Sequence, residues 1–207
     1  DHAALNRQLY HVVEEMKIAG GMQHMPSIYI IDAPYMNAFA SGWRQKDSIV
    51  AITKPLLQAL TREELQAVMA HELSHILHQD TKLMTVVSVL SSISIWVIDT
   101  IFRSVLYGVG RHGRRGSQRG GPLIVVVFII RIILPIITAF LVMYVSRSRE
   151  MMADSGCIKM TRNPGALASA LKKIHNAHTS QEMKKAYATT AHNSLRSLAY
   201  MYDPNAL

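Results

Sequence analysis

The pattern of apolar residues changes within the first third of the chain, from one typical of a helix to one typical of short strands. Over residues 3–18 apolar residues recur every three to four positions, the spacing of an amphipathic helix, and Gly20 and Gly21 would end that helix. Three short runs of β-branched, aromatic or small residues follow, at 27–31, 37–42 and 47–53. Such runs, separated by turn-forming residues, predict a small, largely antiparallel sheet.

Helical spacing returns after the predicted sheet. A short helix would have Thr53 as its cap and Pro55 in its first turn. A longer helix is predicted over residues 61–79, because Thr61 and Glu64 match the T-x-x-E capping box. Its apolar residues recur at helical spacing; they are Leu65, Val68, Met69, Leu73, Ile76 and Leu77.

Two long apolar runs, residues 83–107 and 123–145, dominate the middle of the chain. Each exceeds the roughly 20 residues that a helix needs to cross a bilayer core. The stretch 108–121 between them is rich in glycine and arginine. We therefore predict a transmembrane helical hairpin with a basic loop. The alternative, two buried helices of a soluble core, would need more covering surface than the remaining residues supply.

Each apolar run contains an isolated charge at a similar distance from the predicted loop. Asp99 lies eight residues before Tyr107, and Arg131 lies eight residues after Leu123. An unpaired charge within a bilayer is costly, so we expect Asp99 to pair with Arg131, or with Arg103 four residues along its own helix. The alternative is a hairpin that lines a wet groove.

Further helices are expected after the second apolar run. Asn163 and Pro164 mark the start of a helix over residues 164–175, and a last amphipathic helix is predicted over residues 181–201.

Composition agrees with a membrane protein. Hydrophobic residues make up 49% of the 207 residues and charged residues only 17%, whereas about a quarter is usual for soluble domains. The net charge of +8 could reflect a solvated surface, nucleic acid or anionic lipid. No nucleic-acid motif accompanies the charge, and basic residues gather beside the apolar runs, so we favour lipid headgroups. A single cysteine, Cys157, excludes an intrachain disulfide.

The helix predicted over 61–79 carries the sequence His-Glu-x-x-His. His71 and His75 lie four residues apart and so share one face of the helix, where both imidazoles can bind one metal ion. Glu72 lies beside them, placed to take a proton from a water on that metal. The pattern predicts a single catalytic zinc per chain, although the motif can also occur by chance.

A catalytic zinc takes three protein ligands, and Glu150 is a candidate for the third. Asp154 follows four residues later on the same helical face, and could accept a hydrogen bond from the second ring nitrogen of a ligand histidine such as His71. A hairpin would return the chain to the side that it left and bring Glu150 near His71 and His75. The alternative is a solvated helix face on which Arg149 pairs with these carboxylates.

The strand predicted just before the motif is a candidate substrate site. Residues Asn37, Ala38, Phe39 and Ala40 could align a peptide as an added strand, which would give recognition through the backbone with little dependence on sequence. The alternative is an ordinary strand that only covers the helices.

These residues together resemble the HtpX family of membrane-bound zinc metalloproteases, of the gluzincin type. The resemblance rests on the segment 37–42, on the motif 71–75, on the segment 146–154 and on the hydrophobic hairpin between the last two. It implies that His71, His75 and Glu150 bind zinc, that Glu72 is the general base, and that Asp154 supports a ligand. Nearly the whole chain is covered.

The resemblance also sets expectations for the whole protein. It implies an α+β, mostly helical fold, in which a gluzincin-like protease domain of residues 1–82 and 146–207 is interrupted by a transmembrane hairpin of residues 83–145. It implies ATP-independent cleavage of misfolded membrane proteins during stress and heat shock, in the bacterial inner membrane, with the active site facing the cytoplasm. Two N-terminal membrane helices and a C-terminal tail typical of the family are absent, so we expect a fragment.

A membrane interaction or scaffold protein with a structural or vestigial metal site is the competing interpretation. Glu72 argues against it, because a structural site has no use for a base. Structural zinc sites also tend to use four ligands, commonly cysteines.

Overall fold

The computed structural model describes residues 2–111 and 120–179 of the chain, and two compact units are present. One unit joins Asp1–Lys82 with Arg149–Leu207, and the other is Leu83–Ser148. The helix predicted over 181–201 lies outside the described residues, as does the 112–119 part of the predicted basic loop.

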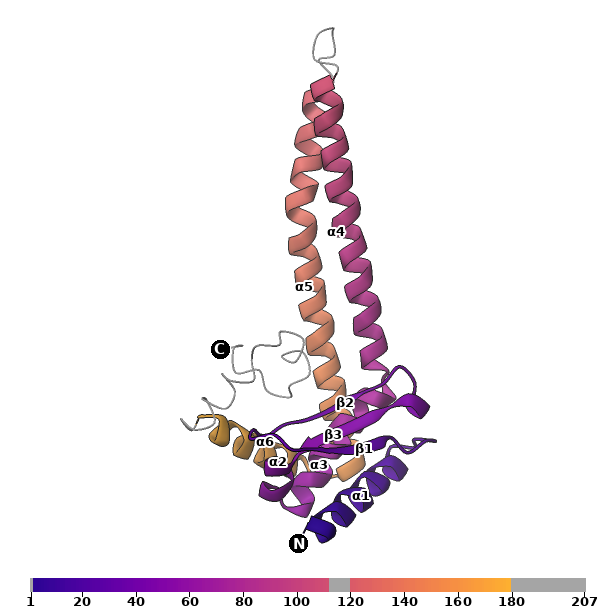
Figure 1. Ribbon diagram of the computed structural model, residues 1–207, viewed down its shortest axis with the longest axis vertical. Coiled ribbons are helices and arrows are strands. Elements are labelled where there is room, and N and C mark those ends of the chain that lie inside the picture. The colour runs from indigo at the N-terminus through magenta and orange to yellow at the C-terminus, as the bar shows by residue number, and fades with distance from the viewer. Residues whose placement is uncertain (1, 112–119, 180–207) are drawn as a thin grey trace. The chain divides into compact units, whose positions relative to one another are not determined.

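The described residues are mostly helical, with one small sheet, as predicted (Figure 1). In chain order the elements are α1 (His2–Ala19), β1 (Ser27–Ile31), β2 (Ala38–Ser41), the short 3-10 helix η1 (Gln45–Asp47), β3 (Ile49–Thr53), α2 (Lys54–Ala59), α3 (Arg62–Leu77), α4 (Asp80–Arg111), α5 (Gly120–Thr161) and α6 (Pro164–Thr179). The end predicted for the first helix is confirmed, because Gly21 takes up a left-handed conformation with φ of 68°.

The sheet is mixed, with strand order β1-β3-β2. β2 runs antiparallel to β3, with Ala38 opposite Ile52, but β1 runs parallel to β3, with Ser27 opposite Ile49. The largely antiparallel sheet that the sequence suggested is therefore wrong for one of the two pairings. The reason is that β3, the most buried strand, takes the central position between the two strands that precede it.

Helix α3 is the centre of the first unit, and α1, α6 and β2 pack against it. The predicted capping box is present: the Thr61 side chain accepts the Glu64 N–H, and the Glu64 carboxylate accepts the Thr61 N–H at 2.8 Å. Most of α3 is buried, including the polar residues His71, Glu72 and Ser74. A buried polar side chain normally has a hydrogen-bond or charge partner, so these three residues are candidates for a functional role.

Thr53 occupies the predicted cap position of α2, but its side chain makes no capping hydrogen bond. Its hydroxyl instead accepts the Asn37 N–H at 2.9 Å and donates to the Asn37 carbonyl at 3.2 Å. The Thr53 N–H also donates to that carbonyl. These bonds fasten the beginning of β2 to the end of β3.

In the second unit, α4 and α5 run side by side as a helical hairpin (Figure 1). Asp99 lies 2.8 Å from Arg131 across the hairpin and 2.7 Å from Arg103 along α4, so both predicted partners share its carboxylate. The Arg131 guanidinium also lies over the Phe102 ring, 4.3 Å from its centroid. By length and composition, two described helices could cross a membrane, in the ranges Asp80–Tyr107 and Val125–Thr161.

Candidate metal centre

The two motif histidines converge on one point from consecutive turns of α3. The Nε2 atoms of His71 and His75 are 3.2 Å apart, and the rings meet edge to face at 85°. The helix supplies this arrangement directly, because residues four apart lie above one another on one face.

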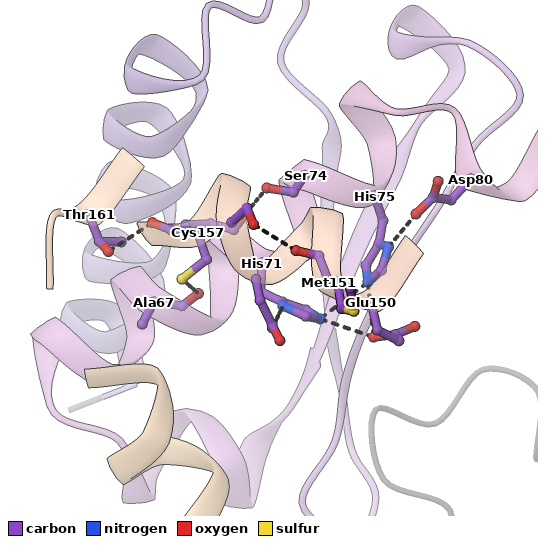
Figure 2. A network of polar contacts seen from close by, with 12 residues as sticks. Ala67, His71, Ser74, His75, Asp80, Glu150, Met151, Cys157 and Thr161 are labelled. Carbon is purple, nitrogen blue, oxygen red and sulfur yellow. Dashed lines mark hydrogen bonds and ion pairs between the residues drawn. The ribbon is translucent and has the colours of Figure 1, made fainter. Parts of the chain in front are cut away.

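Glu150 approaches the same point from α5, which continues past the apolar run to Thr161 without a break. Its Oε2 lies 3.6 Å from Nε2 of His71 and 3.9 Å from Nε2 of His75. One ligand atom from each of the three residues lies within 4.8 Å of the others. Figure 2 shows both imidazoles and the Glu150 carboxylate turned toward one another.

The Nδ1 atom of each ring, the nitrogen that points away from the other histidine, lies beside a carboxylate. His75 Nδ1 is 2.6 Å from Asp80, and His71 Nδ1 is 3.1 Å from Asp154. The His71 contact is close enough for a hydrogen bond but is not aligned as one, and this Nδ1 has no hydrogen-bond partner among the described residues. Carboxylates beside both Nδ1 atoms favour protons there, which leaves the inner Nε2 lone pairs facing each other.

The two Nε2 atoms lie 3.2 Å apart with the Glu150 carboxylate beside them, and this donor set fits zinc. Nitrogens bound to a tetrahedral zinc at about 2.0–2.1 Å are about 3.3 Å apart. Two imidazoles and one carboxylate also match the ligand set of catalytic zinc sites, which leave a fourth position open.

Asp80 is the part of this site that the sequence analysis missed. It is the first residue of α4 and lies five residues after His75, a spacing that helical periodicity does not place on one face. The only signal in the sequence is an acidic residue at the junction between the motif helix and the apolar run. Its burial and its contact with His75 are visible only in the structure.

Glu72 lies buried between α3 and the sheet and is 4% exposed. Burial raises the pKa of its carboxyl above the usual range, while nearby His71 and His75 and a hydrogen bond from the Ala40 backbone N–H act in the opposite direction. For His71, burial acts to lower the pKa, but Glu150, Glu72 and Asp154 outweigh it and raise the pKa above its ordinary value. A buried carboxyl group and a histidine, each with a raised pKa, therefore lie side by side.

The four candidate substrate residues are placed differently from one another. Asn37 is buried and its backbone is bonded to Thr53. From that bonded pair, the alternation of an antiparallel ladder turns the peptide groups of Phe39 toward β3 and those of Ala38 and Ala40 toward the open edge of β2. The Ala40 N–H uses that direction to reach Glu72.

The end of α5 is held against α3 by buried contacts near the candidate metal ligands (Figure 2). The Cys157 thiol donates to the Ala67 carbonyl at 3.2 Å, and Cys157 is fully buried in the core. It is a packing residue, and it helps to set the position of Glu150 two turns earlier on the same helix.

Comparison with known proteins gives consistent matches over nearly the whole chain. The profile of Peptidase family M48 matches residues 3–199. Proteins named Protease HtpX homolog are similar: the one from Helicobacter pylori J99 is 40% identical over 96% of this chain, and the one from Caldanaerobacter subterraneus is 39% identical over 89%. The chain covers 60% and 61% of the length of these two relatives. No solved structure matches the chain.

Proposed function

This chain belongs to peptidase family M48, a family of metallopeptidases, and on that premise we propose that it is a zinc-dependent endopeptidase. His71, His75 and Glu150 hold the zinc in this proposal, and Glu72 is the general base. The observation that carries it is the convergence of three ligand atoms within 4.8 Å beside a buried carboxylate.

The mechanism follows from where the side chains lie. A zinc ion, when bound, polarises the scissile carbonyl and makes a water more acidic. Glu72 takes the proton of the attacking water and passes it to the leaving amine nitrogen. Its raised pKa suits a group that must both accept and return a proton. In this proposal Asp80, hydrogen-bonded to Nδ1 of His75, and Asp154, beside Nδ1 of His71, favour protons on the Nδ1 atoms and leave the Nε2 atoms to the metal.

We place the substrate backbone along the open edge of β2. The peptide groups of Ala38 and Ala40 face that edge, and no other described strand pairs with it. A peptide added there would lie close to Glu72, because the Ala40 N–H already contacts this carboxylate. Asn37 and Phe39 keep the strand in register with β3 and contribute indirectly.

We assign residues 83–145 to a membrane-spanning hairpin and residues 1–82 and 146–207 to the protease domain. The most apolar stretches of α4 and α5 are not buried against other parts of the protein, as expected for helices that face lipid. Five hydroxyls of α4 donate to carbonyls of their own helix, which satisfies them without water. Those with such a bond are Ser91, Ser92, Ser94, Thr100 and Ser104.

The substrates that we propose are misfolded or damaged membrane proteins, cleaved without ATP in the inner membrane of a bacterium. The similarity to bacterial proteins named Protease HtpX homolog supports this assignment. The active site would face the cytoplasm. An epitope tag added after Leu207 should then be degraded by a protease added to inside-out vesicles, and protected in intact spheroplasts.

Glu72→Gln tests the catalytic assignment in the full chain, in detergent with added zinc. The variant should bind one zinc per chain but lose cleavage of casein by at least about 100-fold, because the general base is gone. Glu63→Gln is the matched control, since Glu63 is an exposed glutamate at the start of the same helix.

The outcomes separate the two functional interpretations. Cleavage by wild type and by Glu63→Gln, but not by Glu72→Gln, supports the protease. Equal cleavage by all three proteins contradicts the role of Glu72. Binding of one zinc by each protein with no cleavage by any of them would favour the scaffold interpretation.

A further inference from the structure

The contact between Asp80 and His75 is the shortest of the polar contacts around the metal centre. His75 Nδ1 is 2.6 Å from Asp80 Oδ2, and only 7% of the Asp80 side chain is exposed. A buried carboxylate accepting from Nδ1 holds the proton on that nitrogen and directs the Nε2 lone pair inward. By comparison, the Asp154 side chain on the His71 side is 53% exposed, and its contact is not aligned as a hydrogen bond.

The turn between α3 and α4 directs Asp80 back toward the site. α3 ends at Leu77, and Gln79 adopts a left-handed conformation with φ of 55°. The Gln79 N–H donates to the Ile76 carbonyl. A non-glycine residue held in this region costs about 1 kcal/mol or more, so the surrounding structure must maintain it. Without this turn, α3 would continue and carry the residue five positions beyond His75 to another face.

Asp80 also contacts the other ligand-bearing helix through its backbone. The Arg149 guanidinium donates from Nη1 to the Asp80 carbonyl at 3.1 Å. Arg149 directly precedes Glu150, so the same contact restrains the chain that carries the third ligand. Asp80 therefore restrains two candidate ligands. Its side chain contacts His75, and its carbonyl contacts Arg149, the neighbour of Glu150.

We propose that Asp80 is a positioning residue that links His75 to Glu150, so that the beginning of α4 determines how tightly the centre holds its metal. This inference rests on the proposed zinc site. It predicts that Asp80 matters more for metal affinity than Asp154 does. The Asp80 carboxylate is buried and hydrogen-bonded, whereas the Asp154 carboxylate is exposed and has no hydrogen bond from the described residues.

The test measures zinc affinity of the full chain in detergent by competition with a chelating dye. Asp80→Ala should weaken zinc binding by about 10- to 100-fold, the usual range for a carboxylate behind a ligand histidine. Asp80→Asn keeps an acceptor for Nδ1–H without the charge, so its affinity should lie between those of wild type and Asp80→Ala. Arg149→Leu should weaken binding too. Asp32→Asn, at an exposed carboxylate, is the matched control.

Two further readouts separate positioning from general stability. The visible spectrum of the cobalt-loaded chain should change in Asp80→Ala and stay unchanged in Asp32→Asn. The melting temperature of the metal-free Asp80→Ala chain should stay close to that of the metal-free wild type, because the substitution acts on the metal site and not on general stability. If Asp80→Ala does not fold, Asp80→Asn carries the same test.

The proposal and the function beneath it fail in different ways. If wild type binds no zinc, the proposed function is contradicted. If wild type binds one zinc and Asp80→Ala and Asp80→Asn bind it equally well with unchanged cobalt spectra, the Asp80 inference alone is overturned. Wild-type affinity in Arg149→Leu overturns the link to Glu150.

Discussion

Gly156 on α5 lies directly against Ser74 on α3, so closely that a Cβ on Gly156 would be 2.2 Å from the Ser74 hydroxyl oxygen and 3.0 Å from its Cβ. Ser74 lies between the two motif histidines, and Gly156 lies two residues after Asp154. The contact therefore sets how closely the helix of the third ligand approaches the helix of the first two.

Gly156→Ala should lower the zinc affinity of the full chain by about tenfold. The new methyl group would push the helices apart by roughly 1 Å, since a close-packed interior has no room to accept it. The Ser74 hydroxyl is buried and donates to the Ala70 carbonyl at 2.9 Å, so rotating it away sacrifices a buried hydrogen bond. Even after rotation, the Ser74 Cβ remains in the way. Dye competition measures the affinity.

A compensating change gives the control for this prediction. Ser74→Gly removes both atoms that the new methyl group would meet, so Gly156→Ala with Ser74→Gly should recover most of the affinity. Ser74→Gly alone should cost about 0.5 kcal/mol of helix propensity. A double variant that binds zinc as weakly as Gly156→Ala would show that the spacing of the helices does not control the site.

Local features of the fold could be predicted where residues close together in the sequence determine them. The capping box of α3, the glycine stop of α1 and the strand Ser27–Ile31 each depend on neighbouring residues, and the structure has all three. The approach of His71 to His75 is similarly local, since one helical turn produces it. The role of this cluster in metal binding remains part of the proposed function.

Features that depend on tertiary placement could not be predicted. The parallel pairing of β1 arises because the third strand inserts between the first two, and no local pattern encodes that order. Thr53 prefers a partner on another strand to a cap on its own helix. Asp80 reaches His75 only because Gln79 is left-handed, and glutamine gives no sign of such a conformation in a sequence.

Glu64 should make the stability of the protein depend on pH in the acidic range. Burial acts to raise its pKa, but bonds from Lys173, Ser169 and the Thr61 N–H outweigh this and lower the pKa to about 2. A carboxylate whose pKa is lower in the folded state stabilises the fold above its unfolded pKa of about 4.3, and that contribution disappears as the pH falls toward 2.

Glu64→Gln should therefore lower the free energy of unfolding at pH 7 by about 2 kcal/mol, a value reduced because Lys173 is 41% exposed. Chemical unfolding in detergent at several pH values should show the wild-type and variant curves converging near pH 2. Glu63→Gln, at an exposed site, should follow wild type throughout. A gap between wild type and Glu64→Gln that is independent of pH would contradict the ion pair as its cause.

Asp99 and Arg131 should be coupled energetically across the hairpin. A double-mutant cycle with Asp99→Asn and Arg131→Gln should give an interaction energy of about 0.5–2 kcal/mol, the range found for polar pairs between membrane helices. The cycle of Asp99→Asn with Arg103→Gln should give less, because an i,i+4 pair along one helix typically contributes about 0.3–0.5 kcal/mol. Reversible unfolding in mixed detergent measures both. Coupling of zero to Arg131 would mean that the contact does not stabilise the hairpin.

Backbone methylation of a cleavable peptide tests the proposed substrate strand. Only alternate N–H groups of a strand point toward its neighbour, and on β2 it is the peptide groups of Ala38 and Ala40 that face the open edge. N-methylation at successive positions near the scissile bond should therefore lower kcat/KM at every second residue, by about tenfold for each lost hydrogen bond, and have little effect at those between. Losses that do not alternate would contradict binding by strand addition, even if cleavage still required Glu72.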